Sequence, residues 1–377
     1  MTIKVLVLSG GGGRGAFHAG VFKYLMQAQK SGVDHAHQGA WVPDIIIGTS
    51  IGAVNGAAIT QGMSAEALEQ FWLSLRERDV QGIPPGMGVL ARWVTQRMMR
   101  SFIGTKLPVV SKEKAFSPDA EDSWPPIPLL PGRLSRWLIG RWNNLLDTAP
   151  LYETMLTRMR LDEQKIAESR TRLIISATNV QTGEAMLFSN YPMTHRRTGR
   201  DMVKTPVTGR RIIASCSIPI VYPWTKDTDD QLYWDGAVVA NTPLSPAFDA
   251  VSDQPIEEIM EAVIVMMTPW WETDEAPPAG ARLPQDFAEA MTFALDWALL
   301  ASFRTELKTA RTFSRMSQDA VQQGKPMQYR IVQDVIVAPE QFLPVARIID
   351  YDESASRMLI DQGYQAAEKA FRQQFRE

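Results

Sequence analysis

Two strand–turn–helix units near the N-terminus constrain the fold most. In the first, the apolar run at residues 5–8 leads through the glycine-rich loop GGGGRG (10–15) into a helical pattern. In the second, PDIIIG (43–48) leads through a serine-containing turn into a helix of small residues. Short continuous apolar runs are typical of buried parallel strands. The β–α–β–α order therefore predicts an α/β fold with a mostly parallel central sheet, whose functional site lies at the carboxyl ends of the strands.

The glycine loop by itself has two interpretations. Gly10, Gly12 and Gly15 follow an apolar strand, as the dinucleotide-binding fingerprint requires. That fingerprint also needs an acidic residue about 20 positions further on, at the end of the next strand. Asp34 lies in a polar segment and Asp44 begins a strand, so neither fits that place well. A dinucleotide-binding oxidoreductase therefore stays as the alternative function. The serine-containing turn after residues 43–48 distinguishes the two interpretations of the loop.

The second turn contains a candidate nucleophile. Ser50 stands between Gly48 and Gly52 in GTSIG, after an apolar strand and before a helix of small residues. A serine on a tight strand-to-helix turn needs glycines on both sides, because a Cβ atom there would collide with the helix and the strand. Such a turn exposes the hydroxyl and points the positive end of the following helix at the same place. We therefore predict that Ser50 is a nucleophile on an elbow.

The glycine loop then has a function beside this serine. A nucleophile that attacks a carbonyl creates an oxyanion, and the main-chain N–H groups of Gly11, Gly12 and Gly13 can converge on that charge. Arg14 would add a positive charge, or would brace the loop through hydrogen bonds to the backbone. The predicted oxyanion hole therefore consists of residues 11–14.

The base that serves Ser50 is sought among histidines and carboxylates. His195 lies among arginines in a polar segment and is the alternative base. Asp235 closes the strand-like segment QLYWD and is followed by Gly236, so a plain Asp-Gly turn is the simpler interpretation of these letters. A carboxylate at the carboxyl end of a strand would, however, lie at the same edge of the sheet as Ser50. The two aromatic residues before it would raise its pKa and make it a better proton acceptor.

A set of motifs resembles the patatin-like phospholipases, a family of lipid acyl hydrolases. GGGGRG looks like the glycine-rich GGGxRG motif of that family, GTSIG matches its GxSxG elbow, and DGA (235–237) matches its DG[GA] motif. ASCSIP (214–219) resembles its ASxxxP segment, and ANTP (240–243) resembles the usual continuation. The resemblance covers about residues 5–245, apart from an insertion that has no match.

The resemblance implies a three-layer α/β/α fold and a Ser50–Asp235 dyad in place of a triad. Ser50, deprotonated by Asp235, would attack a fatty-acyl ester, and the glycine loop would hold the oxyanion. The reaction would need no metal and no organic cofactor. A lipid-binding module without catalysis is a further alternative, which the intact Ser50 and Asp235 disfavour.

The segment at about 82–150 differs from the rest of the chain. Between residues 85 and 150 nine Lys and Arg stand against five Asp and Glu, and this segment holds four of the eleven tryptophans. GVLARWVTQRMMRSFIG (88–104) has a broad apolar side with Trp93 and a cationic side, which is typical of a helix in a membrane interface. A packed lid or a dimer contact uses the same pattern. We therefore predict a lid-like insertion with possible peripheral membrane contact through 85–150.

Composition excludes several classes of protein. A net charge of −3 argues against a dedicated nucleic-acid binder. The single cysteine, Cys216, excludes an internal disulfide and is interpreted as a small buried hydrophobe. The chain opens directly into a strand, without the pattern of a signal peptide, and contains no apolar run long enough to span a membrane. These features predict a cytoplasmic protein that visits membranes.

We predict one patatin-like α/β domain over residues 1–377. Its catalytic core would occupy about 5–270, with the insertion at about 82–150 and a C-terminal helical region at about 280–377. The sequence leaves open the preference for phospholipid or neutral lipid, the position of the ester that is cleaved, and the oligomeric state.

Overall fold

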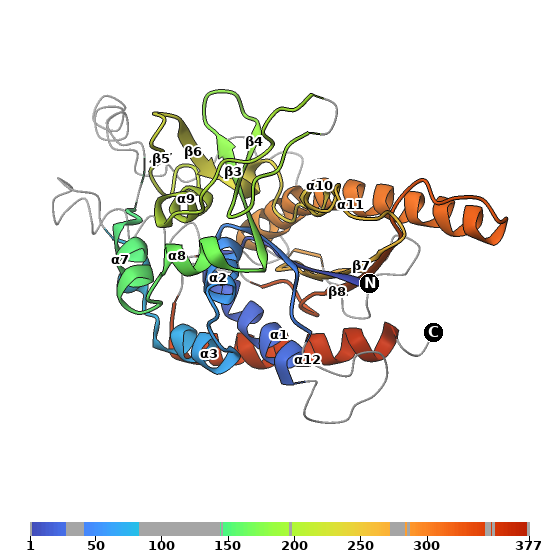
Figure 1. Cartoon of the computed structure of the whole chain (residues 1–377). Coiled ribbons are helices and arrows are strands. Elements are labelled where there is room, and N and C mark those ends of the chain that lie inside the picture. The colour runs from blue at the N-terminus through green and yellow to red at the C-terminus, as the bar shows by residue number, and fades with distance from the viewer. Residues whose placement is uncertain are drawn as a thin grey trace, which may run out of the picture.

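A mostly parallel sheet lies at the centre of the protein (Figure 1). The computed structural model describes residues 2–27, 41–82, 144, 146–195, 198–271, 283–284, 287–343, 348 and 351–374. Within these residues the sheet has eight strands, in the order β5-β6-β3-β2-β1-β7-β8, with β4 paired to β3. The strands are β1 (Thr2–Leu8), β2 (Ile45–Thr49), β3 (Arg172–Asn179), β4 (Ala185–Ser189), β5 (Thr225–Lys226), β6 (Leu232–Asp235), β7 (Ile259–Val265) and β8 (Val332–Val337).

The five strands β1, β2, β3, β7 and β8 are parallel to one another, whereas β4 and β6 are antiparallel to β3. β3 and β4 form a hairpin, and Gly183, which lies between the two strands, adopts a φ of 70°. Strand β6 pairs only with the last residues of β3, and β5 follows it at the edge. The predicted mostly parallel α/β sheet is therefore confirmed.

Helices cover both faces of the sheet, as expected for a three-layer fold. After β1 come η1 (Gly12–Gly15) and α1 (Ala16–Gln27), and after β2 come α2 (Ile51–Thr60), α3 (Ala65–Ser74) and α4 (Glu77–Val80). They are followed by α7 (Ala149–Thr157), α8 (Glu163–Glu168), α9 (Gly209–Ser215), η3 (Gly236–Val238), α10 (Ser245–Ala250), α11 (Phe287–Gln322) and α12 (Glu353–Gln374). In Figure 1, α1, α3 and α12 lie on one side of the sheet, and α10 and α11 lie on the other.

The two faces of the sheet have separate cores because successive side chains of a strand point to opposite sides. In β1, Leu6 and Leu8 pack into the core that α1, α2, α3 and α12 cover. Val5 and Val7 pack into the second core, beneath α10 and α11. All four side chains are at most 1% exposed, so residues 5–8 of the strand are buried on both faces, as their continuous run of apolar letters predicts.

The C-terminal region differs from its prediction as helical. The two long helices α11 and α12 are present, but β8 lies between them in the sequence and pairs with β7. The sheet therefore continues beyond residue 270, where the core was expected to end. β8 was missed because its short pattern, VQDVIV, contains polar residues and stands between two much longer helical patterns.

The predicted insertion leaves and rejoins the fold at neighbouring points. Gly82 and Asp147 form an antiparallel bridge, with backbone N···O distances of 2.8 and 2.9 Å. Residues 83–143 and 145, which carry the predicted amphipathic helix, lie outside the described residues. Within the described part of the chain, no helix is both long and apolar enough to cross a membrane.

Candidate active site

Ser50 occupies a strained turn between β2 and α2. Its φ of 56° and ψ of −126° lie in a region that residues with a side chain rarely adopt. A Cβ atom at Gly48 would lie 2.5 Å from the carbonyl oxygen of Gly52, and one at Gly52 would lie 2.2 Å from that of Leu8. The steric need for both glycines, which the sequence predicts for an elbow, is therefore present. Ser50 is 3% exposed and stands at the N-terminal end of α2.

Asp235 reaches this turn because two strands run toward each other along one side of β3. β2 ends at Thr49, which is opposite Ser176 of β3. β6 runs in the reverse direction and ends at Asp235, which is opposite Ala177, the next residue of β3. The carboxyl ends of β2 and β6 thus meet. The prediction that Asp235 ends a strand is confirmed. The predicted reason for its proximity to Ser50 is wrong, because β6 is antiparallel to β3 and does not share the carboxyl edge of the parallel strands. The two residues are close because the ends of β2 and β6 meet.

The Asp235 carboxyl is buried, at 2% exposure, and its environment sets its pKa. Burial raises the pKa to about 7, while a hydrogen bond from the Ser50 hydroxyl and one from the Ala237 amide act in the opposite direction. The Ala237 N–H donates to Oδ1 at 2.8 Å. Oδ2 has no hydrogen-bond partner among the described residues, so the Ser50 hydroxyl, whose proximity lowers the pKa, lies near the carboxyl without a hydrogen bond to Oδ2. Contacts between catalytic groups often tighten only when substrate binds.

One segment, ASCSIP, contacts both residues of the candidate dyad. The backbone N–H of Ser50 donates to Ser215 Oγ at 2.8 Å, and Ser215 Oγ donates to the carbonyl of Ser176 at 2.6 Å. The backbone N–H of Asp235 donates to the carbonyl of Ser217 at 2.9 Å. Ser215 lies at the end of α9 and is fully buried. The sequence predicted no role for either serine, although the polar letters in an otherwise apolar segment were the available signal.

The glycine loop lies beside Ser50. A Cβ atom at Gly10 would be 3.0 Å from Ser50 Cβ, and the Gly10 N–H donates to Asn241 Oδ1 at 2.9 Å. The ANTP motif therefore holds the start of the loop. The remaining motif glycines are also closely packed: Gly15 against Ile51 and Trp72, and Gly236 against Ser176.

The amides of Gly11, Gly12 and Gly13 lie at the N-terminal end of η1, which leads directly into α1. Among the hydrogen bonds between described residues, none uses these three amides as donors. Unpaired N–H groups at a helix N-terminus carry partial positive charge and favour an anion. The glycine loop therefore has N–H donors of the kind that an oxyanion needs, and the loop lies beside Ser50.

Arg14 braces the loop. Its guanidinium donates from Nη1 to Asp296 Oδ1 at 3.0 Å and to the Met267 carbonyl at 3.4 Å, and from Nη2 to the Leu343 carbonyl at 3.0 Å. Of the two predicted roles of this side chain, these contacts correspond to bracing: Nη1 and Nη2 donate to protein acceptors, whereas Nε has no partner among the described residues. Arg14 is 1% exposed.

Two other sequence candidates lie in different environments. His195, the alternative base, is exposed, and its Nδ1 atom is 3.1 Å from the hydroxyl of Thr198. Cys216 is buried next to the dyad, and burial raises the pKa of its thiol well above the ordinary value. A thiol that stays protonated is a poor nucleophile, so the interpretation of Cys216 as a small buried hydrophobe agrees with its surroundings.

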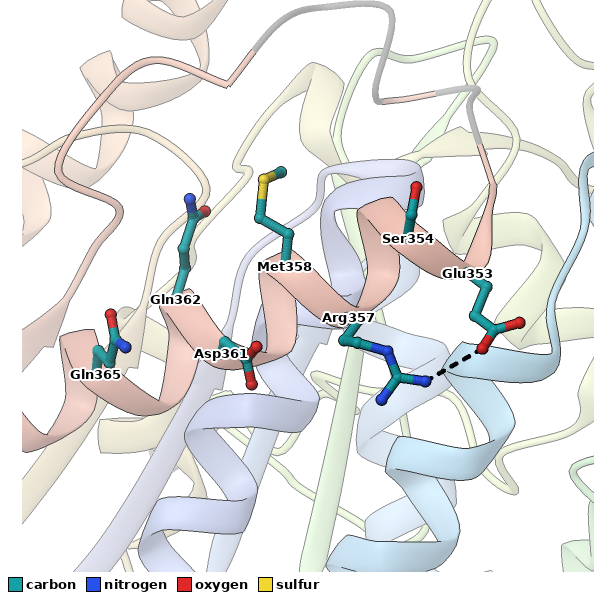
Figure 2. A pocket seen from close by; sticks show the side chains of 7 residues that line it. All are labelled: Glu353, Ser354, Arg357, Met358, Asp361, Gln362 and Gln365. Carbon is teal, nitrogen blue, oxygen red and sulfur yellow. Dashed lines mark hydrogen bonds and ion pairs between the residues drawn. The ribbon is translucent and has the colours of Figure 1, made fainter.

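A hollow of about 660 Å³ lies away from these residues, on the outer side of α12 (Figure 2). Its lining includes Met358 and the ion pair between Arg357 and Glu353, whose N···O distance is 3.1 Å. None of the predicted site residues lines it. The hollow is therefore separate from the dyad and from the glycine loop.

Comparison with known proteins agrees with the motifs. The family model described as patatin-like phospholipase matches residues 6–248. No curated protein matches the chain. Among solved structures, VipD from Legionella pneumophila is 10% identical with a TM-score of 0.38, over 99% of this chain and 67% of VipD. The type III effector protein ExoU is 11% identical with a TM-score of 0.33, over 99% of this chain and 53% of ExoU.

The family match covers more than half of the chain and includes the glycine loop, the elbow and the DGA motif. This chain belongs to the patatin-like phospholipase family.

Proposed function

We propose that the protein is a serine lipid acyl hydrolase that cleaves fatty-acyl esters. Ser50 is the nucleophile, Asp235 is the base, and the amides of Gly11, Gly12 and Gly13 form the oxyanion hole. The observation that carries the proposal is the meeting of Ser50, on its strained turn, with a buried carboxyl whose pKa burial raises to about 7. Membership of the family supports a lipid substrate.

The reaction has two steps. The Asp235 carboxylate takes the proton of the Ser50 hydroxyl while Oγ attacks the ester carbonyl, which gives a tetrahedral intermediate whose oxyanion accepts hydrogen bonds from the loop amides. The intermediate collapses to an acyl-enzyme, and the leaving alcohol receives the proton from Asp235. Asp235 then takes a proton from a water molecule whose oxygen attacks the acyl-enzyme. The second tetrahedral intermediate collapses, Ser50 Oγ receives this proton from Asp235, and the fatty acid leaves.

The raised pKa suits this task. A carboxylate with an ordinary pKa is a weak base, and proton transfer to it from a serine hydroxyl is unfavourable. A pKa of about 7 makes Asp235 a stronger base that is still largely deprotonated at slightly alkaline pH. Each well-placed oxyanion donor contributes about 10²–10³-fold in rate, so the loop matters as much as the base.

Labelling with a fluorophosphonate tests the nucleophile. We expect the reagent to modify Ser50, as identified by mass spectrometry of the labelled peptide, and Ser50→Ala to abolish both labelling and ester hydrolysis. Ser9→Ala is the matched control, because Ser9 is a buried serine just before the glycine loop whose hydroxyl has no partner among the described residues. Failure of the folded wild type to react would refute the proposal. Tight binding of a nicotinamide or flavin nucleotide in that case would favour the oxidoreductase.

Contact with a membrane surface through residues 85–150 belongs to the same proposal, as does a cytoplasmic location. Apart from residues 144 and 146–150, the segment lies outside the described residues, so its cationic and tryptophan-rich composition is the support. Deletion of the segment, with activity compared on vesicles and on a soluble ester, tests this part of the proposal.

A further inference from the structure

Arg14 connects the glycine loop to parts of the chain beyond the family match at residues 6–248. Its Nη1 atom donates to Asp296 Oδ1 on α11, and its Nη2 atom donates to the carbonyl of Leu343, which follows β8. The third acceptor, the carbonyl of Met267, follows β7. Each acceptor of this guanidinium therefore lies C-terminal to residue 248.

The ion pair between Arg14 and Asp296 is almost completely buried, at 1% and 0% side-chain exposure. Two buried charges lose their hydration, so such a pair contributes little net stability, and the effect of this pair on the geometry of the loop is the matter to test. The guanidinium is planar and donates in fixed directions. With one carboxylate and two carbonyls as acceptors, its plane, and with it the backbone of Arg14, has one orientation.

The same C-terminal segments also enclose the loop sterically. Gly12 has a φ of 56°, and a Cβ atom there would lie 2.0 Å from the carbonyl oxygen of Ile348. A Cβ atom at Gly11 would lie 2.7 Å from Met267 Cγ. Residues 10–13 are four consecutive glycines, which have more backbone freedom than any other sequence of this length. External contacts must therefore hold their N–H groups in one direction.

We propose that Asp296 is a positioning residue that orients the oxyanion loop through Arg14. The carboxylate holds the guanidinium, the guanidinium fixes residue 14, and this in turn directs the amides of Gly11, Gly12 and Gly13 toward the carbonyl oxygen on Ser50. The inference rests on the proposed function and extends it, because it makes α11, outside the family-matched region, a part of the catalytic machinery.

The test measures affinity for a tetrahedral adduct. A fatty-acyl trifluoromethyl ketone adds to a nucleophilic serine and forms an oxyanion, so its Ki reports the oxyanion hole, whereas the KM for a short soluble ester does not. A Ki is also independent of the fraction of active protein. In Asp296→Ala we expect the Ki to rise about 10-fold or more, with kcat reduced and KM changed less than about 2-fold.

Asp334→Ala is the matched control. Asp334, on β8, pairs with Arg311, which lies on α11 as Asp296 does. The N···O distances are 3.1 and 2.6 Å, and this pair joins α11 to β8 without contact to the glycine loop. We expect its Ki to equal that of the wild type. An Asp296→Ala protein with the wild-type Ki, or an equal rise in both variants, would overturn the positioning role.

Asp296→Asn keeps the inference testable if Asp296→Ala does not fold. The amide oxygen still accepts a hydrogen bond from Arg14 but lacks the charge, so the Ki should rise about 3-fold, between the wild type and the alanine variant. A wild-type Ki in Asp296→Asn would then overturn the proposal. A wild type that neither hydrolyses esters nor binds the ketone would instead refute the proposed function itself, and the role of Asp296 with it.

Discussion

Asp235 lies next to Ser50 because the strands that carry them run toward each other along one side of β3, with Thr49 opposite Ser176 and Asp235 opposite Ala177. The two candidate catalytic residues are 185 positions apart in the sequence, and one step of β3 separates their strand ends. The relative position of the two residues therefore depends on the backbone of a single central strand.

Replacement of Asp235 tests the base. Asp235→Asn keeps the size of the side chain and removes its basicity, so kcat/KM for a soluble ester should fall at least about 10²-fold. Circular dichroism should show an unchanged fold. His195→Ala is the control, since His195 is exposed, and it should retain normal activity. Normal turnover in Asp235→Asn together with an inactive His195→Ala protein would assign the base to His195.

The pH dependence of hydrolysis should report the same carboxyl. Because only the deprotonated form of Asp235 accepts a proton, kcat/KM should fall about tenfold per pH unit below the pKa of about 7 and should reach a plateau above it. The measurement is kcat/KM for a non-ionisable short ester from pH 5 to pH 9. A profile that is flat between pH 5 and pH 8 would contradict the assignment.

The free energy of unfolding should fall as the pH rises, whereas kcat/KM should rise. The pKa of Asp235 is higher in the folded protein, at about 7, than the ordinary value of 3.8, so the folded state binds the proton more tightly. The resulting stabilisation is complete below the unfolded pKa and is lost as the pH rises to about 7. Asp235→Asn has no such loss.

We therefore compare the unfolding free energy of Asp235→Asn with that of the wild type at two pH values. The value for the variant minus the value for the wild type should be roughly 2–3 kcal/mol larger at pH 8 than at pH 5. Urea denaturation of both proteins at the two pH values measures it. An equal difference at both values would mean that the carboxyl is not buried in the way described.

Ser215 should act on the rate through Ser50. In Ser215→Ala the backbone N–H of Ser50 and the carbonyl of Ser176 both lose their partner, which should cost about 1–3 kcal/mol of stability and lower kcat about tenfold. Ser317→Ala is the matched control, because Ser317 Oγ likewise accepts from the N–H and donates to the carbonyl of one residue, Tyr329. A similar loss of stability without a change in kcat is expected there. Equal kcat values in the two variants would deny Ser215 a positioning role.

Removal of the insertion should separate its possible roles. Two backbone hydrogen bonds hold Gly82 next to Asp147, so a short Gly-Ser linker can replace residues 84–145 without moving the residues on either side. If the insertion contacts membranes, hydrolysis of phospholipid vesicles should fall much more than hydrolysis of a short soluble ester. An equal loss on both substrates would favour a structural lid.

The parts of the site that are local in sequence could be predicted. The elbow follows from the steric requirement for Gly48 and Gly52 around one serine, and this requirement is visible in five letters. The place of the glycine loop follows from glycines between a strand and a helix, and its role as an oxyanion hole stays a prediction. Asp235 was found as the end of a strand, because aromatic letters and an Asp-Gly turn mark that end.

The parts that depend on pairing between distant segments could not be predicted. No local signal says that β6 is antiparallel to β3 and meets β2 end to end, nor that β8 extends the sheet. Asp296 resembles any acidic letter of an amphipathic helix, and only the folded chain shows that it is buried against Arg14. The role of Ser215 in holding the Ser50 amide was hidden for the same reason.

The contact between Arg14 and Asp296 spans 282 positions, which has a consequence for biosynthesis. A ribosome makes the glycine loop and the elbow early, whereas Asp296, whose carboxylate holds the Arg14 guanidinium, emerges only after most of the chain has been translated. An unfinished polypeptide would therefore carry Ser50 and the glycine loop before Asp296, which holds the Arg14 guanidinium, has been made.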